Sequence, residues 1–224
     1  MILCIADVLT AKDLDAINSL LHTANFVDGK TTAGWHARLV KHNTQLQDDG
    51  SAAVQHLKTL ISQALQRNSL FQMAVLPKVI REALFSRYDS GMSYGTHVDN
   101  AVMGKSELMR SDVSLTLFLS QPETYDGGEL VIESSQGEQG YKLAAGSMIV
   151  YPSTTLHRVE PVTAGSRLAA VTWVQSLVRD SAQREILFDL DTARQMLFEK
   201  SGKNAEFDLI SKTYANLLRQ WAAL

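Results

Sequence analysis

The sequence contains a single cysteine, Cys4, among its 224 residues. One thiol excludes an internal disulfide framework and a cysteine-rich zinc site. We interpret Cys4 as a small buried hydrophobic residue of an N-terminal strand. The chain also shows no Ser/His/Asp set and no cysteine beside a histidine motif, so nothing indicates nucleophilic catalysis.

Long apolar runs and an excess of basic residues are also absent. No stretch approaches the roughly 20 apolar residues that span a bilayer. The N-terminus lacks the basic region and long apolar core of a signal peptide. The net charge of −3 gives no electrostatic support for binding nucleic acid. We therefore expect a cytoplasmic protein with no membrane or nucleic-acid partner.

The first third of the chain predicts a strand and two helices. Residues 2–9 are typical of a short strand, and Thr10 with Asp13 forms a partial capping box that opens a helix fading near Asn25. A second amphipathic helix is predicted from Ser51 to about Asn68. We interpret residues 1–77 as an N-terminal strand with supporting helices.

Residues 78–177 carry many short apolar segments separated by turn signals. Residues 79–88 predict one strand, and in 113–120 apolar side chains alternate with Ser114 and Thr116. Gly127 and Gly128 mark a turn that needs positive φ. The fold class predicted is α+β with a mostly β core: a double-stranded β-helix, or jelly-roll, barrel.

Helical spacing returns after residue 177, so residues 178–224 are predicted to form a helical C-terminal extension. A first helix stops at Gly202, and a last helix carries an apolar stripe that includes Trp221. The stripe is most simply packing surface against the barrel, and a second subunit is the alternative. The oligomeric state stays open.

Three residues have the pattern of a metal site. His97 and Asp99 are two positions apart, so on a strand both point to one face, with Val98 turned into the core. His157 supplies a third candidate ligand from a later strand. Two imidazoles and one carboxylate form the facial set typical of non-haem Fe(II) oxygenases, which leaves open positions for cosubstrate and dioxygen. The short His-x-Asp motif alone is common by chance.

Arg167, ten residues after His157, strengthens this interpretation. A turn at residues 163–165 predicts that the strand carrying Arg167 folds back beside that of His157. An arginine inside a barrel is costly unless it meets an anion, and a guanidinium binds a carboxylate through two parallel hydrogen bonds. The far carboxylate of a metal-chelating 2-oxoglutarate would be such a partner.

These motifs resemble the 2-oxoglutarate/Fe(II) dioxygenase superfamily, in the branch of the prolyl and lysyl hydroxylases, and more closely the bacterial PKHD-type hydroxylases. The resemblance spans the chain and rests on SRYDSGMSYGTHVDNAV (86–102), RSDVSLTLFLS (110–120), YDGGELVI (125–132), YPSTTLHRVEPVTAGSR (151–167) and QSLVRDSAQREILFDLD (175–191). It implies His97, Asp99 and His157 as iron ligands and Arg167 as the 2-oxoglutarate anchor. It also implies Tyr88 as a cosubstrate contact, although ring packing is as plausible for this side chain. Phe118 stands about where some prolyl hydroxylases have a further cosubstrate tyrosine.

The resemblance implies an Fe(II)- and 2-oxoglutarate-dependent dioxygenase, with ascorbate (vitamin C) keeping the iron reduced and no catalytic side chain beyond the metal centre. It would hydroxylate an unidentified substrate, a peptidyl residue or a small molecule linked to iron uptake, while 2-oxoglutarate is decarboxylated to succinate and CO2. The alternative is a non-catalytic, cupin-like metal-binding or sensing module. A nucleic-acid demethylase is disfavoured by the acidic balance.

Two further features complete the expectations. Residues 100–112 are polar and unpatterned, typical of either a mobile flap over the metal or a plain surface loop. The remaining histidines lack ligand spacing and are interpreted as surface or structural residues; they are His22, His36, His42 and His56.

Overall fold

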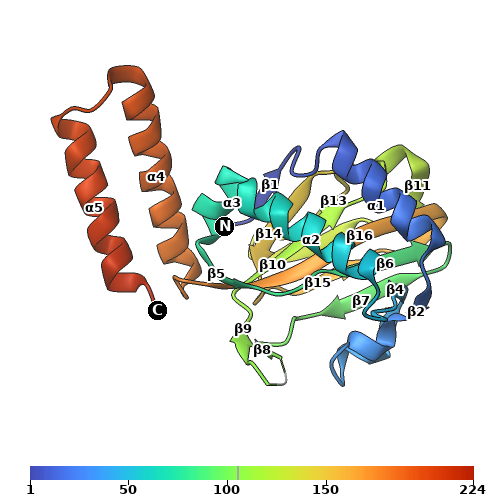
Figure 1. Cartoon of the computed structure of the whole chain (residues 1–224). Coiled ribbons are helices and arrows are strands. Elements are labelled where there is room, and N and C mark those ends of the chain that lie inside the picture. Colours follow the sequence, from blue (N-terminus) through green and yellow to red (C-terminus); the bar gives the residue numbers. More distant parts are fainter. Residues whose placement is uncertain (105) are drawn as a thin grey trace.

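Two antiparallel β-sheets form the centre of the protein in a computed structural model that describes residues 1–104 and 106–224 (Figure 1). The larger sheet has the order β1 (Leu3–Ile5), β14 (Met148–Pro152), β10 (Val113–Phe118), β16 (Val162–Ser176), β6 (Leu84–Asp89), β4 (Thr44–Leu46) and β2 (Phe26–Asp28), and β16 also pairs with β5 (Pro77–Ile80) and β11 (Tyr125–Gly127). The smaller has the order β13 (Gly137–Tyr141), β12 (Leu130–Ser134), β15 (His157–Val159), β7 (Ser93–His97) and β3 (Lys41–His42).

The interior between the two sheets is the barrel of the predicted jelly-roll. Side chains from both sheets meet there, among them Phe118 and Ile149 of the larger sheet and Leu130 and Val159 of the smaller one. Burial of these inward-facing residues holds the sheets together. The predicted fold class, a mostly β jelly-roll core with added helices, is confirmed.

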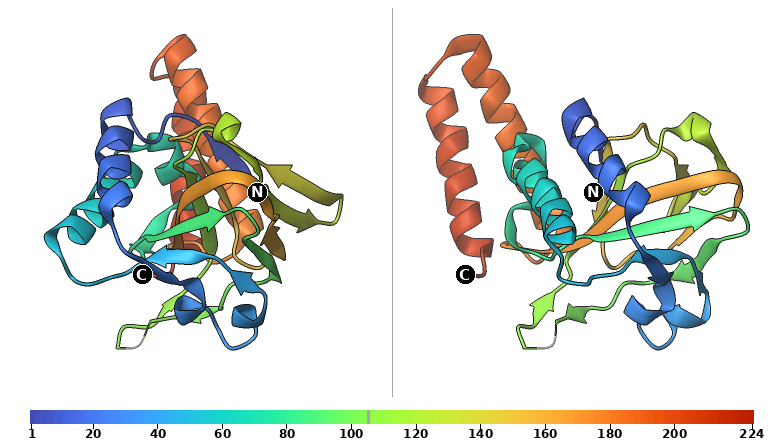
Figure 2. Two further views of the ribbon diagram at one scale, coloured as in Figure 1. Left: turned by 90° about the vertical axis from the view of Figure 1, so that its right-hand side faces the viewer. Right: turned by 45° about the vertical axis from the view of Figure 1, so that its right-hand side comes forward.

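Three N-terminal helices cover the outer face of the larger sheet: α1 (Ala11–Thr23), α2 (Ala52–Arg67) and α3 (Ser69–Val75) (Figure 2). Each contributes apolar side chains to one core with that face of the sheet, among them Ile17 of α1, Ile61 of α2 and Phe71 of α3. The helices therefore shield the larger sheet from water on the side away from the barrel.

The starts of the first two helices agree with the sequence. Thr10 and Asp13 form the predicted capping box of α1, and Ser51 caps α2 by accepting from the backbone amide of Val54. Helix α3 was not predicted, because its seven residues are too few for a clear helical period.

Strand β10 lies within the larger sheet between β14 and β16, and the predicted alternation of its side chains is present. Val113, Leu115 and Leu117 join the core beneath the helices. Ser114 and Thr116 face the other way, into the barrel, and are also buried. Both faces of this strand are therefore covered, one by helices and the other by the smaller sheet.

Several local expectations were wrong. Cys4 is exposed rather than buried, because β1 lies at an edge of the larger sheet. Residues 79–88 form two strands, β5 and β6, instead of one. The strand of Arg167 does not fold back beside that of His157, because residues 163–165 belong to β16 itself. After β15 the chain crosses to the larger sheet, where β16 pairs with β6 and β10.

The C-terminal extension consists of α4 (Ser181–Ser201) and α5 (Ala205–Trp221), which lie side by side and project away from the barrel (Figures 1 and 2). Gly202 ends α4 as predicted. At the base of the pair, Trp221 and Tyr214 pack on a small core formed by Leu76, Val178 and Leu187. Trp221 thus contacts the chain's own body.

The remaining elements are short. A small hairpin of β8 (Val102–Met103) and β9 (Met109–Arg110) occupies part of the polar segment 100–112, in which Lys105 lies outside the described residues. The described residues also form three 3-10 helices, η1 (Gly29–Thr32), η2 (Ala37–Leu39) and η3 (Pro122–Thr124).

Within residues 1–104 and 106–224, none of the helices has the length and apolar character needed to cross a membrane. The division into residues 1–77, 78–177 and 178–224 stays a prediction. Strands from the first of these segments join both sheets, since β1 pairs with β14 and β3 with β7.

Candidate metal centre and cosubstrate pocket

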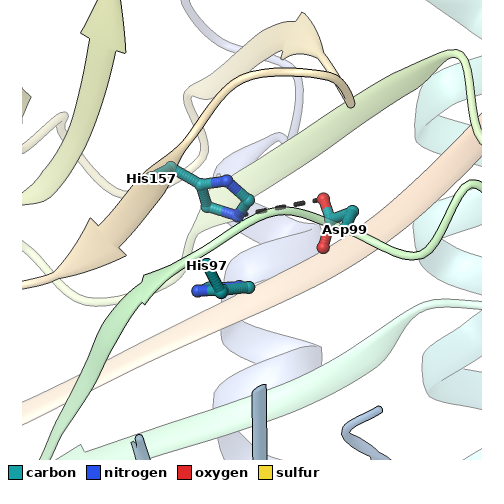
Figure 3. Close-up of side chains that lie close together, drawn as sticks. All are labelled: His97, Asp99 and His157. Carbon is teal, nitrogen blue, oxygen red and sulfur yellow. Dashed lines mark ion pairs between the residues drawn. The ribbon is translucent and has the colours of Figure 1, made fainter. Parts of the chain in front are cut away.

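His97, Asp99 and His157 meet where β7 ends beside β15 (Figure 3). One candidate ligand atom from each lies within 4.8 Å of the other two, and His157 Nε2 is 3.8 Å from Asp99 Oδ2. The two histidines are directly opposite each other in the pairing of β15 with β7. Strand pairing therefore brings together residues that are sixty positions apart in the sequence.

Asp99 reaches the site differently from the expectation. Strand β7 ends at His97, so Asp99 lies just beyond the strand rather than on it. Val98 is partly exposed and lines the cavity, so the prediction that it turns into the core was wrong. The side chains of His97 and Asp99 still converge on one point, and the carboxylate comes close to His157 (Figure 3).

Both imidazoles are held in the orientation that a metal ligand needs. Nδ1 of His97 is 2.9 Å from the Gly95 carbonyl, and Nδ1 of His157 is 3.1 Å from the Thr155 carbonyl. A carbonyl only accepts, so each Nδ1 carries a proton and Nε2 is the nitrogen left for a metal. Burial, together with the neighbouring His157, lowers the pKa of His97 to about 4. His97 is therefore neutral at physiological pH.

The Asp99 carboxylate is positioned by two serines. Ser114 Oγ donates to Asp99 Oδ2 at 2.6 Å, and Ser153 Oγ lies 2.7 Å from Ser114 Oγ. Both serines are buried. Neither serine was predicted to take part in the site, although the alternation in β10 already placed Ser114 opposite the apolar face.

Arg167 is buried in the barrel, with only 1% of its surface exposed. Its guanidinium carbon is 5.2 Å from the centre of the Tyr88 ring and 5.4 Å from that of Phe118. Arg167 and Tyr88 are paired across β16 and β6, so they share one face of the sheet. Within the described part of the chain, Nε and one terminal nitrogen of Arg167 have no hydrogen-bond partner. A buried cation with free donors indicates an anion site.

Tyr125, which was not predicted as a site residue, also lies beside Arg167. A Cβ atom added at Gly128 would lie 3.0 Å from Cδ of Arg167 and 3.1 Å from the Tyr125 ring, so the two side chains converge at this glycine. Gly128 has a φ of 69°, as the predicted turn requires. The Tyr125 hydroxyl is buried and unpartnered among the described residues. Burial raises the pKa of Tyr125, as it does that of Tyr88, so both phenols are available as neutral donors.

A cavity of about 500 Å3 adjoins the metal ligands. Its walls include all three candidate ligands, Tyr88 and Lys41, and the segment 100–112 contributes Asn100, Val102, Met103 and Gly104. The predicted flap or loop segment therefore lies beside the metal ligands, while its mobility stays a prediction. Arg167 is not among the residues that line this cavity, but its guanidinium lies beside the ring of Tyr88, which does line it.

The other histidines lie apart from the candidate site. None of them joins a group of possible metal ligands in the described residues. His22, His42 and His56 are exposed, and His36 is half-buried beside Trp35.

Comparison with known proteins relates the chain to one group. Residues 83–175 match the family model of the 2OG-Fe(II) oxygenase superfamily, and residues 181–223 match the PKHD-type hydroxylase C-terminal domain. A PKHD-type hydroxylase of Synechococcus sp. (strain JA-2-3B'a(2-13)) is 62% identical, with all of both chains covered. One of Crocosphaera subtropica is 58% identical, covering 99% of this chain and 100% of that one.

Solved structures share the fold at low sequence identity. A prolyl-4-hydroxylase of Pseudomonas putida has a TM-score of 0.53 at 20% identity and covers 78% of this chain and 92% of its own. A prolyl hydroxylase of Trichoplax adhaerens has a TM-score of 0.55 at 15% identity and covers 83% and 86%. These solved structures therefore have the same fold as this chain.

Proposed function

Because this chain belongs to the PKHD-type hydroxylases, within the 2-oxoglutarate- and Fe(II)-dependent oxygenases, we propose that His97, Asp99 and His157 are its iron ligands. The observation that supports this most directly is the convergence of their ligand atoms within 4.8 Å. Two imidazoles and a carboxylate are the donor set of non-haem iron oxygenases. Their fixed tautomers suit metal binding without rearrangement.

The enzyme uses dioxygen and 2-oxoglutarate to hydroxylate a substrate that is not identified. Iron bound at the site would activate dioxygen. The overall reaction converts substrate, 2-oxoglutarate and O2 into hydroxylated substrate, succinate and CO2. The protein positions and shields the reactants. Peptide carbonyls orient both histidines, and Ser114 orients Asp99.

We propose Arg167 as the anchor of the distal carboxylate of 2-oxoglutarate, with Tyr88 as a neighbouring contact. Support comes from the buried guanidinium and its unpartnered nitrogens in the described part of the chain. The alternative of a non-catalytic metal-binding barrel gives no reason for such a group. Ascorbate as a reductant and a cytoplasmic location stay predictions from the sequence.

The test is calorimetric titration of 2-oxoglutarate into the protein loaded with Co(II) as a substitute for iron. We expect Arg167→Ala to weaken 2-oxoglutarate binding roughly 100-fold, since a charged hydrogen-bonded pair is lost. Cobalt affinity should be unchanged. Arg219→Ala, on α5, is the matched control. Unchanged 2-oxoglutarate affinity in Arg167→Ala would refute the anchor, and cobalt binding that survives His157→Ala would refute the metal site.

A further inference from the structure

Lys41 is a buried lysine in the wall of the cavity beside the candidate metal ligands. It stands on β3, the strand at one edge of the smaller sheet, and only 5% of its surface is exposed. Lysine is almost never buried without a partner for its charge. In the described residues no carboxylate lies within ion-pair distance of Lys41, so this ammonium has no protein counter-ion there.

A polar network holds the Lys41 side chain in place. Its Nζ donates to Thr32 Oγ1 at 3.1 Å, and the Thr32 hydroxyl in turn bonds Gln45. The Gln45 amide donates to Ser86 Oγ at 3.1 Å on the neighbouring strand β6. An ammonium has three N–H donors, and Thr32 is the one protein partner found for them in the part of the chain described. The lysine is therefore fixed in position with donors left for a ligand.

Lys41 lies close to the candidate metal ligands. Lys41 and Tyr94 are paired across β3 and β7, and Nζ lies 5.1 Å from the centre of the Tyr94 ring. The Tyr94 ring is stacked on His97, with centres 3.7 Å apart. One aromatic ring thus separates the ammonium from a candidate iron ligand. A molecule held by Lys41 would extend toward the metal within the same cavity.

The charges lining the cavity favour an anion. Lys41 and Arg81 are its cationic residues, and Asp99, a candidate metal ligand, is the one carboxylate among the described lining residues. This contrasts with the protein's net charge of −3. The cationic wall is therefore a local feature that attracts negative charge.

Arg167 and Lys41 occupy different places. Arg167 lies beside the Tyr88 ring and is not among the residues that line the cavity, whereas Lys41 is part of that lining. A 2-oxoglutarate molecule that chelates a metal has one further carboxylate, and Arg167 is proposed to bind it. Lys41 is a second buried cation, so it needs a second anionic partner. The substrate, which shares the cavity with 2-oxoglutarate, can supply that partner.

We infer that Lys41 is a specificity-determining residue that binds a carboxylate of the substrate, so the C–H bond to be hydroxylated lies near an acidic group. This inference rests on the proposed function of the site. A free carboxylic acid and an acidic peptide side chain offer the same chemistry. Burial lowers the pKa of Lys41 to about 8, so the amine is still mostly protonated at neutral pH.

The experiment compares carboxylic acids with their amides as ligands of the protein loaded with Co(II) and 2-oxoglutarate. The probes each carry at most one carboxylate: N-acetylglutamate α-amide against N-acetylglutamine α-amide, N-acetylaspartate α-amide against N-acetylasparagine α-amide, and short C-terminally amidated peptides with Glu or Gln at one position. We expect at least one acid to bind roughly 10- to 100-fold more tightly than its amide, from one charged hydrogen bond. Comparing the affinities of the small-molecule acids with those of the peptides then distinguishes a free carboxylic acid from an acidic peptide side chain as the source of the carboxylate.

Variants assign the preference to Lys41. Lys41→Met should remove the preference for acid over amide, Lys41→Arg should keep part of it, and Lys12→Met, on α1, should leave it unchanged. The affinity for 2-oxoglutarate should stay the same in all three. The inference is overturned if no acid outcompetes its amide on the wild-type protein, or if Lys41→Met weakens 2-oxoglutarate binding instead. Should Lys41→Met not fold, the acid and amide comparison on wild type still decides. If the wild-type protein fails to bind cobalt or 2-oxoglutarate at all, that result counts against the proposed function instead.

Discussion

Ser114 donates a 2.6 Å hydrogen bond to the Oδ2 atom of Asp99, and so couples strand β10 of the larger sheet to a candidate iron ligand. Such partners fix a ligand's orientation, and their loss typically lowers metal affinity 10- to 100-fold. We expect Ser114→Ala to weaken Co(II) binding by about that factor, measured by competition with a chelator.

The control for this prediction is Ser135→Ala, in an exposed turn, and Ser114→Thr should restore part of the affinity because it keeps the hydroxyl. The thermal midpoint of the metal-free protein should change little in Ser114→Ala. Equal cobalt affinity in wild type and Ser114→Ala would show that Asp99 needs no such support.

Tyr125 is expected to contribute to the 2-oxoglutarate pocket beside Arg167. Its buried hydroxyl, unpartnered in the described residues, can donate to a carboxylate held by the guanidinium. Tyr125→Phe should therefore weaken 2-oxoglutarate binding about 10-fold, the effect of one hydrogen bond to a charged group. Tyr88→Phe tests the tyrosine implied by the resemblance in the same way. Calorimetry on the cobalt protein is the measurement. Tyr141→Phe, whose hydroxyl bonds Gln139 at the surface, should have no effect.

Burial of the charged Lys41 side chain should lower the free energy of unfolding by an amount that depends on pH. Its pKa is lowered from 10.5 to about 8 in the folded protein, chiefly by burial, which the charges of Asp99 and Asp28 oppose. Between these values the unfolded chain binds more protons at this site, so the free energy of unfolding rises with pH across the window. At pH 7 the full cost is present. Lys41→Met should then raise the unfolding free energy of the metal-free protein by about 2 kcal/mol, after allowing for the lost bond to Thr32.

Urea unfolding of both proteins at pH 7 and at pH 10 measures this difference, which should shrink as the pH approaches 10.5. Lys12→Met controls for the loss of one positive charge. A variant that is less stable than wild type at pH 7 would mean that the Thr32 network outweighs the burial of the ammonium.

Trp221 should stabilise the attachment of the C-terminal helices to the rest of the chain. It packs on the small core around Val178 and Leu187, and just beyond it the Ala223 amide donates to the Leu177 carbonyl at 2.7 Å. Trp221→Ala should lower the free energy of unfolding by about 2 kcal/mol, less than for a fully buried tryptophan. Thermal and urea unfolding measure it, with the exposed Leu224→Ala as control. A variant that changes oligomeric state and not stability would instead assign Trp221 to a subunit contact.

The sequence by itself determined the features that depend on neighbouring residues. Thr10 and Ser51 open helices because their hydroxyls accept from backbone amides three positions ahead. The alternation in β10 was readable because side chains of a strand point to opposite faces in turn. The motif segments between residues 86 and 191 also indicated the family, because each is a run of neighbouring residues.

Tertiary structure alone decided how distant segments meet. His157 lies opposite His97 only because β15 pairs with β7, and Arg167 lies in the other sheet because the chain crosses over after β15. No local sequence pattern distinguished that crossing from a hairpin. Nothing in the sequence around Lys41 indicated that its side chain would be buried beside the metal ligands. Such placements depend on which strands pair and on what the closed barrel buries, and these are properties of the whole chain.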